Sequence, residues 1–414
     1  MPAVRTQLAA LLSSAACIAV VLVALRRRGL PFAIFAGVLG GIHTLLSLAL
    51  FNALFPPATG VPGALGFAAL QSVAYLHYLS LLLGRPRPRL WRALISIPGS
   101  FFLAGTMLAL PLVLLSALGV GLPAHRDLVL LPYGLAALGV LQSLWTRRRE
   151  VDITLHRPGD HTDPLLVRPY PRGLATPPTA GRPLRIVQIS DPHLGPFMSE
   201  QRLHRICAQA VAQEPDLVLL TGDFLTVETQ GEAGPLSRAL APLAALPGRC
   251  SACRGNHDLE APHIVAAALR SAGVRLLIDE EALVTTPAGP VQVLGVDFTF
   301  TDRARHLAAV CAAAPRRPGH LRLVLLHDPG AFRHLPAGEG DLVLSGHTHG
   351  GQLGLLSLGL AWTIVRGLST IPDHGLWARG ADRLYVHRGT GHYGFPLRVG
   401  VPAEEGLLRV HQPG

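Results

Sequence analysis

The sequence of 414 residues contains no lysine, few charged residues and few cysteines. All 36 basic residues are arginine, which we interpret as a compositional bias rather than a functional feature. Charged residues make up only 15% of the chain and apolar residues 49%, and the mean hydropathy is +0.38. Such a composition is too apolar for an ordinary soluble enzyme. The five cysteines indicate no disulfide framework.

Acidic residues are almost missing from the first 150 positions. This part contains twelve arginines but only Asp127 and Glu150, whereas the remainder contains 24 arginines and 24 acids. The whole net charge of +10 therefore belongs to the N-terminal part. The C-terminal part lacks the basic excess that is typical of nucleic-acid-binding proteins, so we expect no nucleic-acid partner.

Long apolar runs fill this N-terminal part. A membrane-spanning helix needs about 20 apolar residues, and five runs reach or approach that length. The pattern predicts a helical, multi-pass membrane region over residues 1–150. The runs are Leu8–Leu25, Pro31–Phe55, Ala64–Gly84, Ala93–Leu122 and Leu128–Trp145.

Basic residues occur in every second connection between the runs. Arg26–Arg28, Arg85–Arg92 and Arg147–Arg149 follow the first, third and fifth runs, while the other connections are nearly neutral. Because arginine-rich loops stay on the cytoplasmic side, we expect an inner-membrane protein whose chain after Trp145 is cytoplasmic.

Three polar residues, His43, Gln71 and His77, lie inside the apolar runs. Ionisable groups within a membrane are candidates for a transport or proton-relay function. Against this alternative, none of the runs contains an acidic partner for the histidines.

The pattern changes after the membrane region. Val151–Arg157 alternates like a short strand, and residues 151–183 as a whole are rich in Pro and Gly and predict a linker. From residue 184 to 414, short apolar runs alternate with amphipathic segments, which predicts an α/β domain. The expected strands are Leu184–Ile189, Leu217–Leu220, Leu321–Leu326 and Leu342–Leu344, and the expected helices are Glu200–Ala212 and Ala261–Ala272.

Metal-ligating side chains follow the expected strands, at the point where each strand ends. In open α/β sheets, the carboxyl ends of the strands form the binding site. We therefore expect a metal site at this edge of the sheet. Its seven candidate ligands are Asp191, His193, Asp223, Asn256, His327, His347 and His349.

The number and type of these ligands indicate two metal ions. Seven donors exceed what one tetrahedral zinc ion needs. A carboxylate that binds both ions would hold them about 3.5–4 Å apart, the spacing used by phosphatases and nucleases. Carboxylate, imidazole and amide donors without a thiolate suit Mn, Fe or Zn.

At this point the sequence resembles the calcineurin-like metallophosphoesterases. The shared pattern consists of Asp191-x-His193, Gly222-Asp223, Gly255-Asn256-His257-Asp258, His327 and Gly346-His347-x-His349, in the order of that family. Ser190–Gly195, Ser345–Gln352 and Arg388–Gly391 resemble more narrowly its membrane-associated branch. Some relatives in that branch hydrolyse UDP-2,3-diacylglucosamine. The resemblance covers about residues 184–411 and implies a two-sheet β sandwich flanked by helices.

The resemblance also implies a role for each residue of the pattern. Asp191, His193, Asp223 and His349 would bind one metal ion, and Asp223, Asn256, His327 and His347 would bind the other. His257 would act at the phosphoryl group as general acid or charge stabiliser, with Asp258 orienting it.

Three further features of the domain allow weaker predictions. Arg366, Arg388 and His392 lie in the segment that follows the last histidine pair, and we expect that at least one of them contacts the substrate. The apolar stretch Leu353–Val365 is a candidate for contact with a lipid tail or the bilayer. Cys250 and Cys253 have the spacing of a redox or zinc pair, but two buried thiols are the simpler interpretation.

These patterns predict a membrane-anchored binuclear metallophosphoesterase that cleaves a phosphodiester or pyrophosphate bond. A lipid-linked substrate, such as a UDP-diacylglucosamine-like molecule, would gain effective concentration from the membrane anchor. The alternatives are a cyclic-nucleotide phosphodiesterase or phosphoprotein phosphatase and, in another class, a membrane transporter or sensor with a regulatory phosphoesterase domain.

Overall fold

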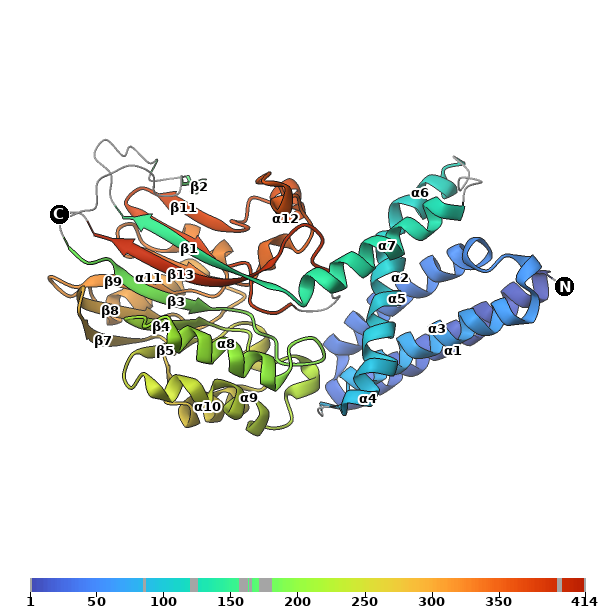
Figure 1. The fold of residues 1–414 in the computed structure, drawn as a ribbon, viewed down its shortest axis with the longest axis horizontal. Helices are drawn as coiled ribbons and strands as arrows, with labels where there is room; N and C mark the ends of the chain where they lie inside the picture. The colour runs from blue at the N-terminus through green and yellow to red at the C-terminus, as the bar shows by residue number, and fades with distance from the viewer. Residues whose placement is uncertain are drawn as a thin grey trace. The chain divides into compact units, whose positions relative to one another are not determined.

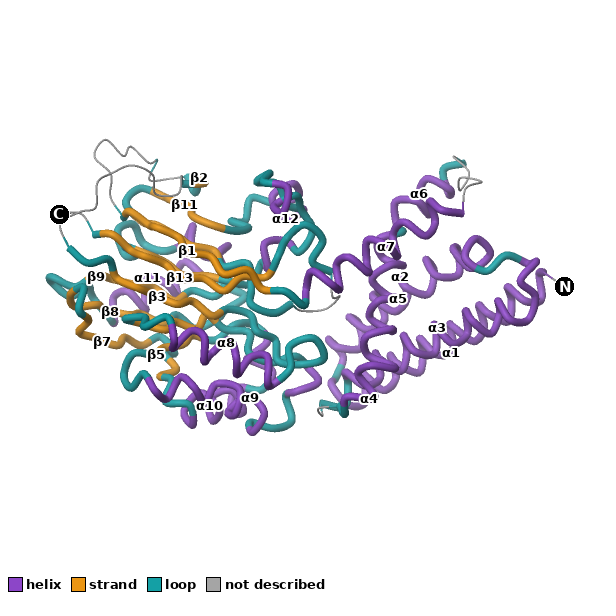
Figure 2. The backbone as a smooth tube through the Cα atoms, viewed as in Figure 1, coloured by secondary structure: helices purple, strands orange, loops and turns teal. Residues whose placement is uncertain are grey.

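The computed structural model describes residues 2–84, 87–119, 126–155, 163, 166–170, 181–392 and 397–412 (Figure 1). The chain divides into a helical unit, formed mainly by the residues up to Gln142, and a mixed unit that contains most of the chain from Ser143 onward. Figure 2 shows that the described strands lie in the second unit. Arg85, and much of the predicted linker 151–183, lie outside the described residues.

The helical unit is built from apolar helices. Three of them, covering Val4–Arg28, Leu30–Leu54 and Gly60–Leu81, are long and apolar enough to cross a membrane. The α-helices of the unit are α1 (Pro2–Arg28), α2 (Leu30–Leu54), α3 (Gly60–Leu81), α4 (Arg89–Trp91), α5 (Ile97–Leu108), α6 (Leu110–Ala117) and α7 (Arg126–Ser143).

The structure does not confirm the predicted count of five spans. The fourth run forms a pair of helices, Arg89–Leu108 and Leu110–Ala117, bent by 41°. The bend occurs next to Pro111, which lacks an N–H and whose ring clashes with the carbonyl one turn earlier. The fifth run forms the shorter apolar helix Leu128–Ser143. The described residues thus contain three helices of spanning length, or four if the bent pair is one span.

The mixed unit contains two sheets. The six-stranded sheet has the order β1-β13-β3-β4-β5-β6, and the seven-stranded sheet has the order β2-β11-β12-β10-β9-β8-β7. The strands are β1 (Thr146–Thr154), β2 (Arg168–Pro169), β3 (Leu184–Ile189), β4 (Leu217–Thr221), β5 (Cys250–Cys253), β6 (Arg275–Leu276), β7 (Glu280–Thr286), β8 (Gly289–Gly295), β9 (Leu321–Leu325), β10 (Leu342–Ser345), β11 (Gly375–Arg379), β12 (Asp382–Val386) and β13 (Ala403–His411).

Apolar side chains on both faces of the central strands explain this layered arrangement. Successive residues of a strand point to opposite faces. In β4, Leu217 and Leu219 enter the core between the two sheets, while Val218 and Leu220 pack under the outer helices. This confirms the predicted two-sheet sandwich flanked by helices (Figure 1). The helices are α8 (Glu200–Ala212), α9 (Gly234–Leu240), α10 (Pro262–Ser271), α11 (Arg303–Ala313) and α12 (Ile364–Leu368).

The first strand of this unit, β1, lies earlier in the chain than residue 184, where the sequence predicts that the domain begins. β1 pairs in parallel with β13 along its whole length, from Thr146 with Ala403 to Thr154 with His411. Val151 and Ile153 alternate into the core between the sheets, which explains why the chain forms a strand there. Residues 151–154 of the predicted linker are therefore part of the sandwich, and Arg147–Arg149 belong to a strand.

The parallel strands β3, β4, β9 and β10 direct their carboxyl ends to one edge of the sandwich. Two hydrogen bonds join the two sheets there. Gln188 Nε2 donates to the carbonyl oxygen of Ser345 at 3.0 Å, and His327 Nδ1 donates to the carbonyl oxygen of Thr221 at 2.6 Å. The loops that carry the predicted ligands consequently meet at one place.

Candidate metal centre

Most of the predicted ligands lie on sharply turned backbone. Asp191, His193, Asp223, His347 and His349 all have positive φ angles, between 45° and 67°. Residues other than glycine rarely adopt this conformation, and strained backbone of this kind is concentrated at functional sites. Each of these five residues follows directly on one of the parallel strands, so the turns bring the side chains back over the sheet edge.

Two glycines make the close approach of these loops feasible. A Cβ atom at Gly255 would lie 2.1 Å from Asp223 Oδ1, and one at Gly346 would lie 1.9 Å from Ser190 Oγ. Neither position has room for a side chain. The glycines of the sequence pattern are thus explained by packing against the carboxylate loops.

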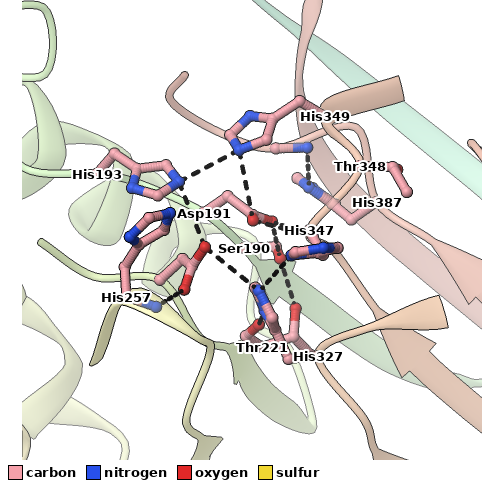
Figure 3. A network of polar contacts seen from close by, with 12 residues as sticks. Ser190, Asp191, His193, Thr221, His257, His327, His347, Thr348, His349 and His387 are labelled. Carbon is pink, nitrogen blue, oxygen red and sulfur yellow. Dashed lines mark hydrogen bonds and ion pairs between the residues drawn. The ribbon is translucent and has the colours of Figure 1, made fainter. Parts of the chain in front are cut away.

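The first group of candidate ligands consists of Asp191, His193 and His349, which are all buried. One donor atom from each lies within 4.8 Å of the others. His193 Nε2 is 3.2 Å from His349 Nε2, which is 3.5 Å from Asp191 Oδ1 (Figure 3). The backbone N–H of His347 donates to Asp191 Oδ1 at 2.9 Å and fixes the carboxylate.

The second group consists of Asp223, His327 and His347. His327 Nε2 lies 3.3 Å from Asp223 Oδ2. It also lies 3.2 Å from His347 Nδ1 (Figure 3). Because His327 Nδ1 donates to the carbonyl of Thr221, its Nε2 is the nitrogen left for a metal ion. Such orienting hydrogen bonds are characteristic of histidine ligands.

Asp223 lies between the two groups. Its Oδ2 atom is 3.3 Å from His327 Nε2 and 3.6 Å from His193 Nε2, so one oxygen faces a ligand of each group. Its Oδ1 atom accepts the backbone N–H of His257 at 2.9 Å. The carboxylate is therefore held in the position that a ligand shared by two ions would need.

Asn256, the seventh predicted ligand, provides an independent indication of a bound cation. Its side-chain Oδ1 atom is buried and has no hydrogen-bond partner in the described residues. Buried polar atoms without a partner are rare in native proteins. An amide oxygen next to carboxylate and imidazole donors, with no thiolate, fits a divalent ion of the Mn, Fe or Zn type.

The electrostatics of the cluster also favour a cation. Burial, helped by the charge of Asp223, raises the pKa of Asp191 to about 6. Burial would raise the pKa of Asp223 too, but His327 and the other imidazoles hold it well below its usual range. Burial opposes a charge on His327, yet Asp223 and Asp191 raise its pKa to about 10. Without a metal, a positive charge on His327 thus balances the negative charge of Asp191 and Asp223.

His257 and Asp258 contact different parts of the site. The Asp258 carboxylate accepts the backbone N–H groups of Asp223, Phe224 and Gly255 at 2.7–2.9 Å and so fastens two loops together. His257 Nδ1 instead donates to Glu260 Oε1 at 3.1 Å. Glu260 is thus a candidate for orienting the ring that the sequence analysis did not include; its position three residues after His257 in a helical turn was the available signal.

The His257 ring lies beside the first metal group, with its centroid 5.5 Å from that of His193 (Figure 3). Burial lowers the pKa of His257, but Glu260 and Asp223 outweigh that effect and raise it overall. A charged imidazole next to the metal ligands is suited to donating a proton or to stabilising negative charge.

The three predicted substrate contacts lie in different surroundings. Arg388 is buried, and its Nε donates to Glu404 Oε2 at 2.9 Å. Arg366 lies over the Trp377 ring, 5.3 Å from its centroid, and 3.9 Å from Asp373. His392 is buried against Phe197. A substrate contact by any of them stays a prediction.

The segment around Arg388 has a clear structural function next to the metal site. The N–H groups of Thr390 and Gly391 donate to the carbonyl oxygens of Ser190 and Asp191 at 2.8 and 3.0 Å. The motif Arg388–Gly391 thereby braces the strained loop that carries Asp191. Cys250 and Cys253 are free thiols buried within β5, as the simpler interpretation of their spacing predicts.

Comparisons with known proteins agree with this geometry. The calcineurin-like phosphoesterase family model matches residues 184–351. Phosphodiesterase YaeI of Escherichia coli (strain K12) is 31% identical over 236 residues, which are 55% of this chain and 82% of that protein. UDP-2,3-diacylglucosamine pyrophosphatase LpxG of Chlamydia trachomatis is 28% identical over 283 residues, which are 55% of this chain and 83% of that protein.

A vertebrate relative combines the same domain with membrane segments. The Danio rerio transmembrane protein with metallophosphoesterase domain is 30% identical over 248 residues, and the chain spans 52% of its length. Together with the strand-end ligands, these similarities confirm the predicted family and its hydrolysis of phosphoester bonds. The chain belongs to the calcineurin-like phosphoesterases.

Proposed function

We propose that the chain is a membrane-anchored, binuclear metallophosphoesterase that cleaves a phosphodiester or pyrophosphate bond in a lipid-linked substrate. The observation that carries this proposal is the position of Asp223 Oδ2, which faces both His193 and His327 across the two ligand groups. The apolar helices of the first unit and the similarity to LpxG support a substrate with a lipid part, of the UDP-diacylglucosamine type.

The residues divide into two ion sites. Asp191, His193 and His349 would hold one ion, and His327, His347 and Asn256 the other, with Asp223 shared between them. Mn, Fe or Zn ions held there would neutralise the charge of the phosphate oxygens and acidify water near neutral pH. The unpartnered oxygen of Asn256 and the burial of both carboxylates, Asp191 and Asp223, support two such ions.

His257 would supply the proton that the leaving oxygen requires. We assign proton donation to its Nε2 atom, because Nδ1 donates to Glu260. Glu260 would fix the orientation of the ring and favour its charged form, while Asp258 would keep the loops of Asp223 and Gly255 in register.

We further propose that the catalytic domain faces the cytoplasm from the inner membrane. The arginine-rich stretches Arg26–Arg28 and Arg147–Arg149 favour this orientation. A reporter that is active only in the periplasm, fused after Gly414, should remain inactive in whole cells. Periplasmic activity of that fusion would contradict the orientation without affecting the metal site.

The metal site is tested with the full-length protein in detergent, loaded with Mn²⁺ and assayed on bis-p-nitrophenyl phosphate. Asp223→Asn should lower the turnover by more than about 100-fold, because even residues that only support a metal ligand are worth 10–100-fold. The matched control is Asp302→Asn, which changes an exposed aspartate that also has a positive φ angle. Full activity of Asp223→Asn would refute the site.

The substrate class is tested with a lipid-linked substrate and its soluble headgroup. The full-length protein in lipid nanodiscs should hydrolyse UDP-diacylglucosamine at a higher kcat/KM than UDP-glucosamine. Equal values for the two compounds would exclude a contribution from the lipid part, while leaving the phosphoesterase assignment intact.

A further inference from the structure

A positively charged pocket lies in the mixed unit, and its lining is separate from the metal ligands. It has a volume of about 380 Å³. Arg147, Arg148 and Arg149 contribute from β1, Arg388 from the segment after β12, and His374 from the residue before β11. None of the seven candidate metal ligands lines this pocket. It is therefore a site that hydrolysis at the metal centre does not explain.

The pocket has a strong excess of positive charge. Its lining residues, all within the described part of the chain, include four arginines and no acid. Carboxylates outside the lining contact two of these arginines: Glu404 is buried and pairs with Arg388 at 2.9 Å, and Glu405 lies 3.9 Å from Arg148. His374 pairs at 2.9 Å with the buried Asp373. Arginine forks of this kind suit the oxygens of a phosphate group.

The other wall of the pocket is apolar and continues as an exposed apolar surface. Leu356, Leu360 and Ala361 line the pocket. Around them, Leu358 is 75% exposed, Trp362 48% and Leu368 81%. A free phosphate ion or a sugar phosphate would leave these side chains in water. A concentration of exposed leucine and tryptophan next to arginine is typical of proteins that bind the membrane interface.

The loop that carries these apolar residues is held together by its own backbone. Leu355 N donates to Trp362 O at 2.9 Å, and Ile364 N donates to Leu353 O at 2.9 Å. A bridge between Gly354 and Thr363 closes the same hairpin-like loop. Leu358 and Leu360 consequently lie near its tip, on a preformed support, and do not depend on a mobile chain end.

The arginines follow the apolar helix α7 closely in the sequence. Three residues separate Arg147 from Ser143, the last residue of that helix. Trp145, between them, is 70% exposed. Tryptophan and arginine next to an apolar helix are the residues that anchor proteins at the headgroup level of a bilayer.

We propose that this pocket binds the phosphate group of an anionic membrane phospholipid, while Leu358, Leu360 and Trp362 enter the acyl layer beside it. The charge complementarity selects an anionic headgroup, and the apolar rim selects a lipid over a free phosphate. Lipid binding in this pocket requires membrane association but not hydrolysis. It can therefore be tested separately from the proposed phosphoesterase activity.

The test compares lipids retained by the full-length protein in native mass spectrometry, after incubation with equal amounts of phosphatidylglycerol and phosphatidylcholine. Arg147→Gln/Arg148→Gln removes two exposed pocket arginines and leaves the buried pair of Arg388 and Glu404 intact. This variant should lower the ratio of retained phosphatidylglycerol to phosphatidylcholine by about tenfold or more. The matched control, Arg270→Gln/Arg305→Gln, removes two exposed arginines elsewhere and should keep the wild-type ratio.

An unchanged lipid ratio in the pocket variant would overturn the proposal. Displacement of phosphatidylglycerol by an equal concentration of inorganic phosphate would also overturn it, because the ligand would then be free phosphate. Both variants are first checked for wild-type elution in size-exclusion chromatography.

Trp362 offers a second measurement that does not depend on the arginines. In nanodiscs containing phospholipids brominated on the acyl chains, the wild type should lose more tryptophan fluorescence than Trp362→Phe, and the difference reports quenching at this residue. No difference between the two proteins would show that the loop does not enter the acyl layer.

Discussion

Buried polar residues occur in both units of this protein, but their partners differ. In the helical unit, His43 Nε2 lies 3.0 Å from Gln71 Oε1, and Gln71 Nε2 donates to Ser47 Oγ at 2.6 Å. His77 Nε2 is paired with Ser100 Oγ at 2.9 Å. At the metal centre, by contrast, imidazole nitrogens face each other at 3.2 Å, and the Asn256 oxygen has no hydrogen-bond partner in the described residues.

This difference separates structural from functional polar groups. Each of the two histidines in the helical unit has one ring nitrogen in a hydrogen bond with a neutral neighbour, although Nδ1 of both is buried without a partner in the described residues. At the metal centre, by contrast, several imidazoles and carboxylates converge on one point, an arrangement that is typical of a cation site. The paired groups of the helical unit thus favour an anchor over the transport or relay function that the sequence left open.

The largest expected effect comes from the loss of the metal ions from the candidate metal centre. Removal of bound ions with a chelator should abolish the hydrolysis of bis-p-nitrophenyl phosphate, and Mn²⁺ or Zn²⁺ should restore it. Activity that persists after exhaustive dialysis against the chelator, with metal loss verified by elemental analysis, would place the metal centre outside the reaction.

The next effect concerns His257. His257→Gln should slow hydrolysis by about 10²–10⁴-fold for an alkyl phosphodiester, whose leaving oxygen needs a proton, and less for p-nitrophenyl esters. Glu260→Gln should show a smaller loss with the same dependence on the leaving group, because Glu260 only orients the ring. Equal losses for both leaving groups would argue for charge stabilisation instead of proton donation.

The buried ion pair between Arg388 and Glu404 in the mixed unit should stabilise the fold. Burial would raise the pKa of Glu404, but Arg388 holds it well below its usual range. A carboxyl group with a depressed pKa stabilises the fold above its unfolded pKa of about 4.3 and loses this contribution as the pH falls toward the folded value. Glu404→Gln should therefore cost about 3–5 kcal/mol at pH 7, since Arg388 remains buried.

The pH dependence provides the check for Glu404. The difference in Tm between wild type and Glu404→Gln should be constant between pH 5 and 7 and should shrink only in more acidic solution. A difference that grows on acidification would have the wrong sign for a depressed pKa.

The smallest effect is expected in the helical unit. His43→Leu/Gln71→Leu removes one hydrogen-bonded pair, and such pairs in membranes average about 0.6 kcal/mol. Thermal unfolding in detergent should shift slightly, and turnover of bis-p-nitrophenyl phosphate should not change. A large loss of activity in this variant would show that the buried polar groups of the helical unit contribute to hydrolysis. It would then favour the alternative of a transport or sensor function coupled to the phosphoesterase domain.

Much of the metal centre could be predicted because its residues follow strands that are recognisable locally. The apolar run Leu184–Ile189 is a strand with the predicted bounds, and the helix Glu200–Ala212 also has them. The strand β1 was recognised only in part, from the alternation that begins at Val151, because its place in the sandwich depends on pairing with a segment about 250 residues later. The bend next to Pro111 was not predicted, because the predicted number of spans considered only the length of the apolar runs.

The sequence by itself determined the types of ligand, their order, their place after strands and the apolar character of the first unit. These are properties of short segments, so neighbouring residues suffice to specify them. Only the tertiary structure decided that Asp223 faces both ligand groups and that Arg147–Arg149 share a pocket with Arg388. These contacts depend on how two sheets pack, which no local pattern encodes.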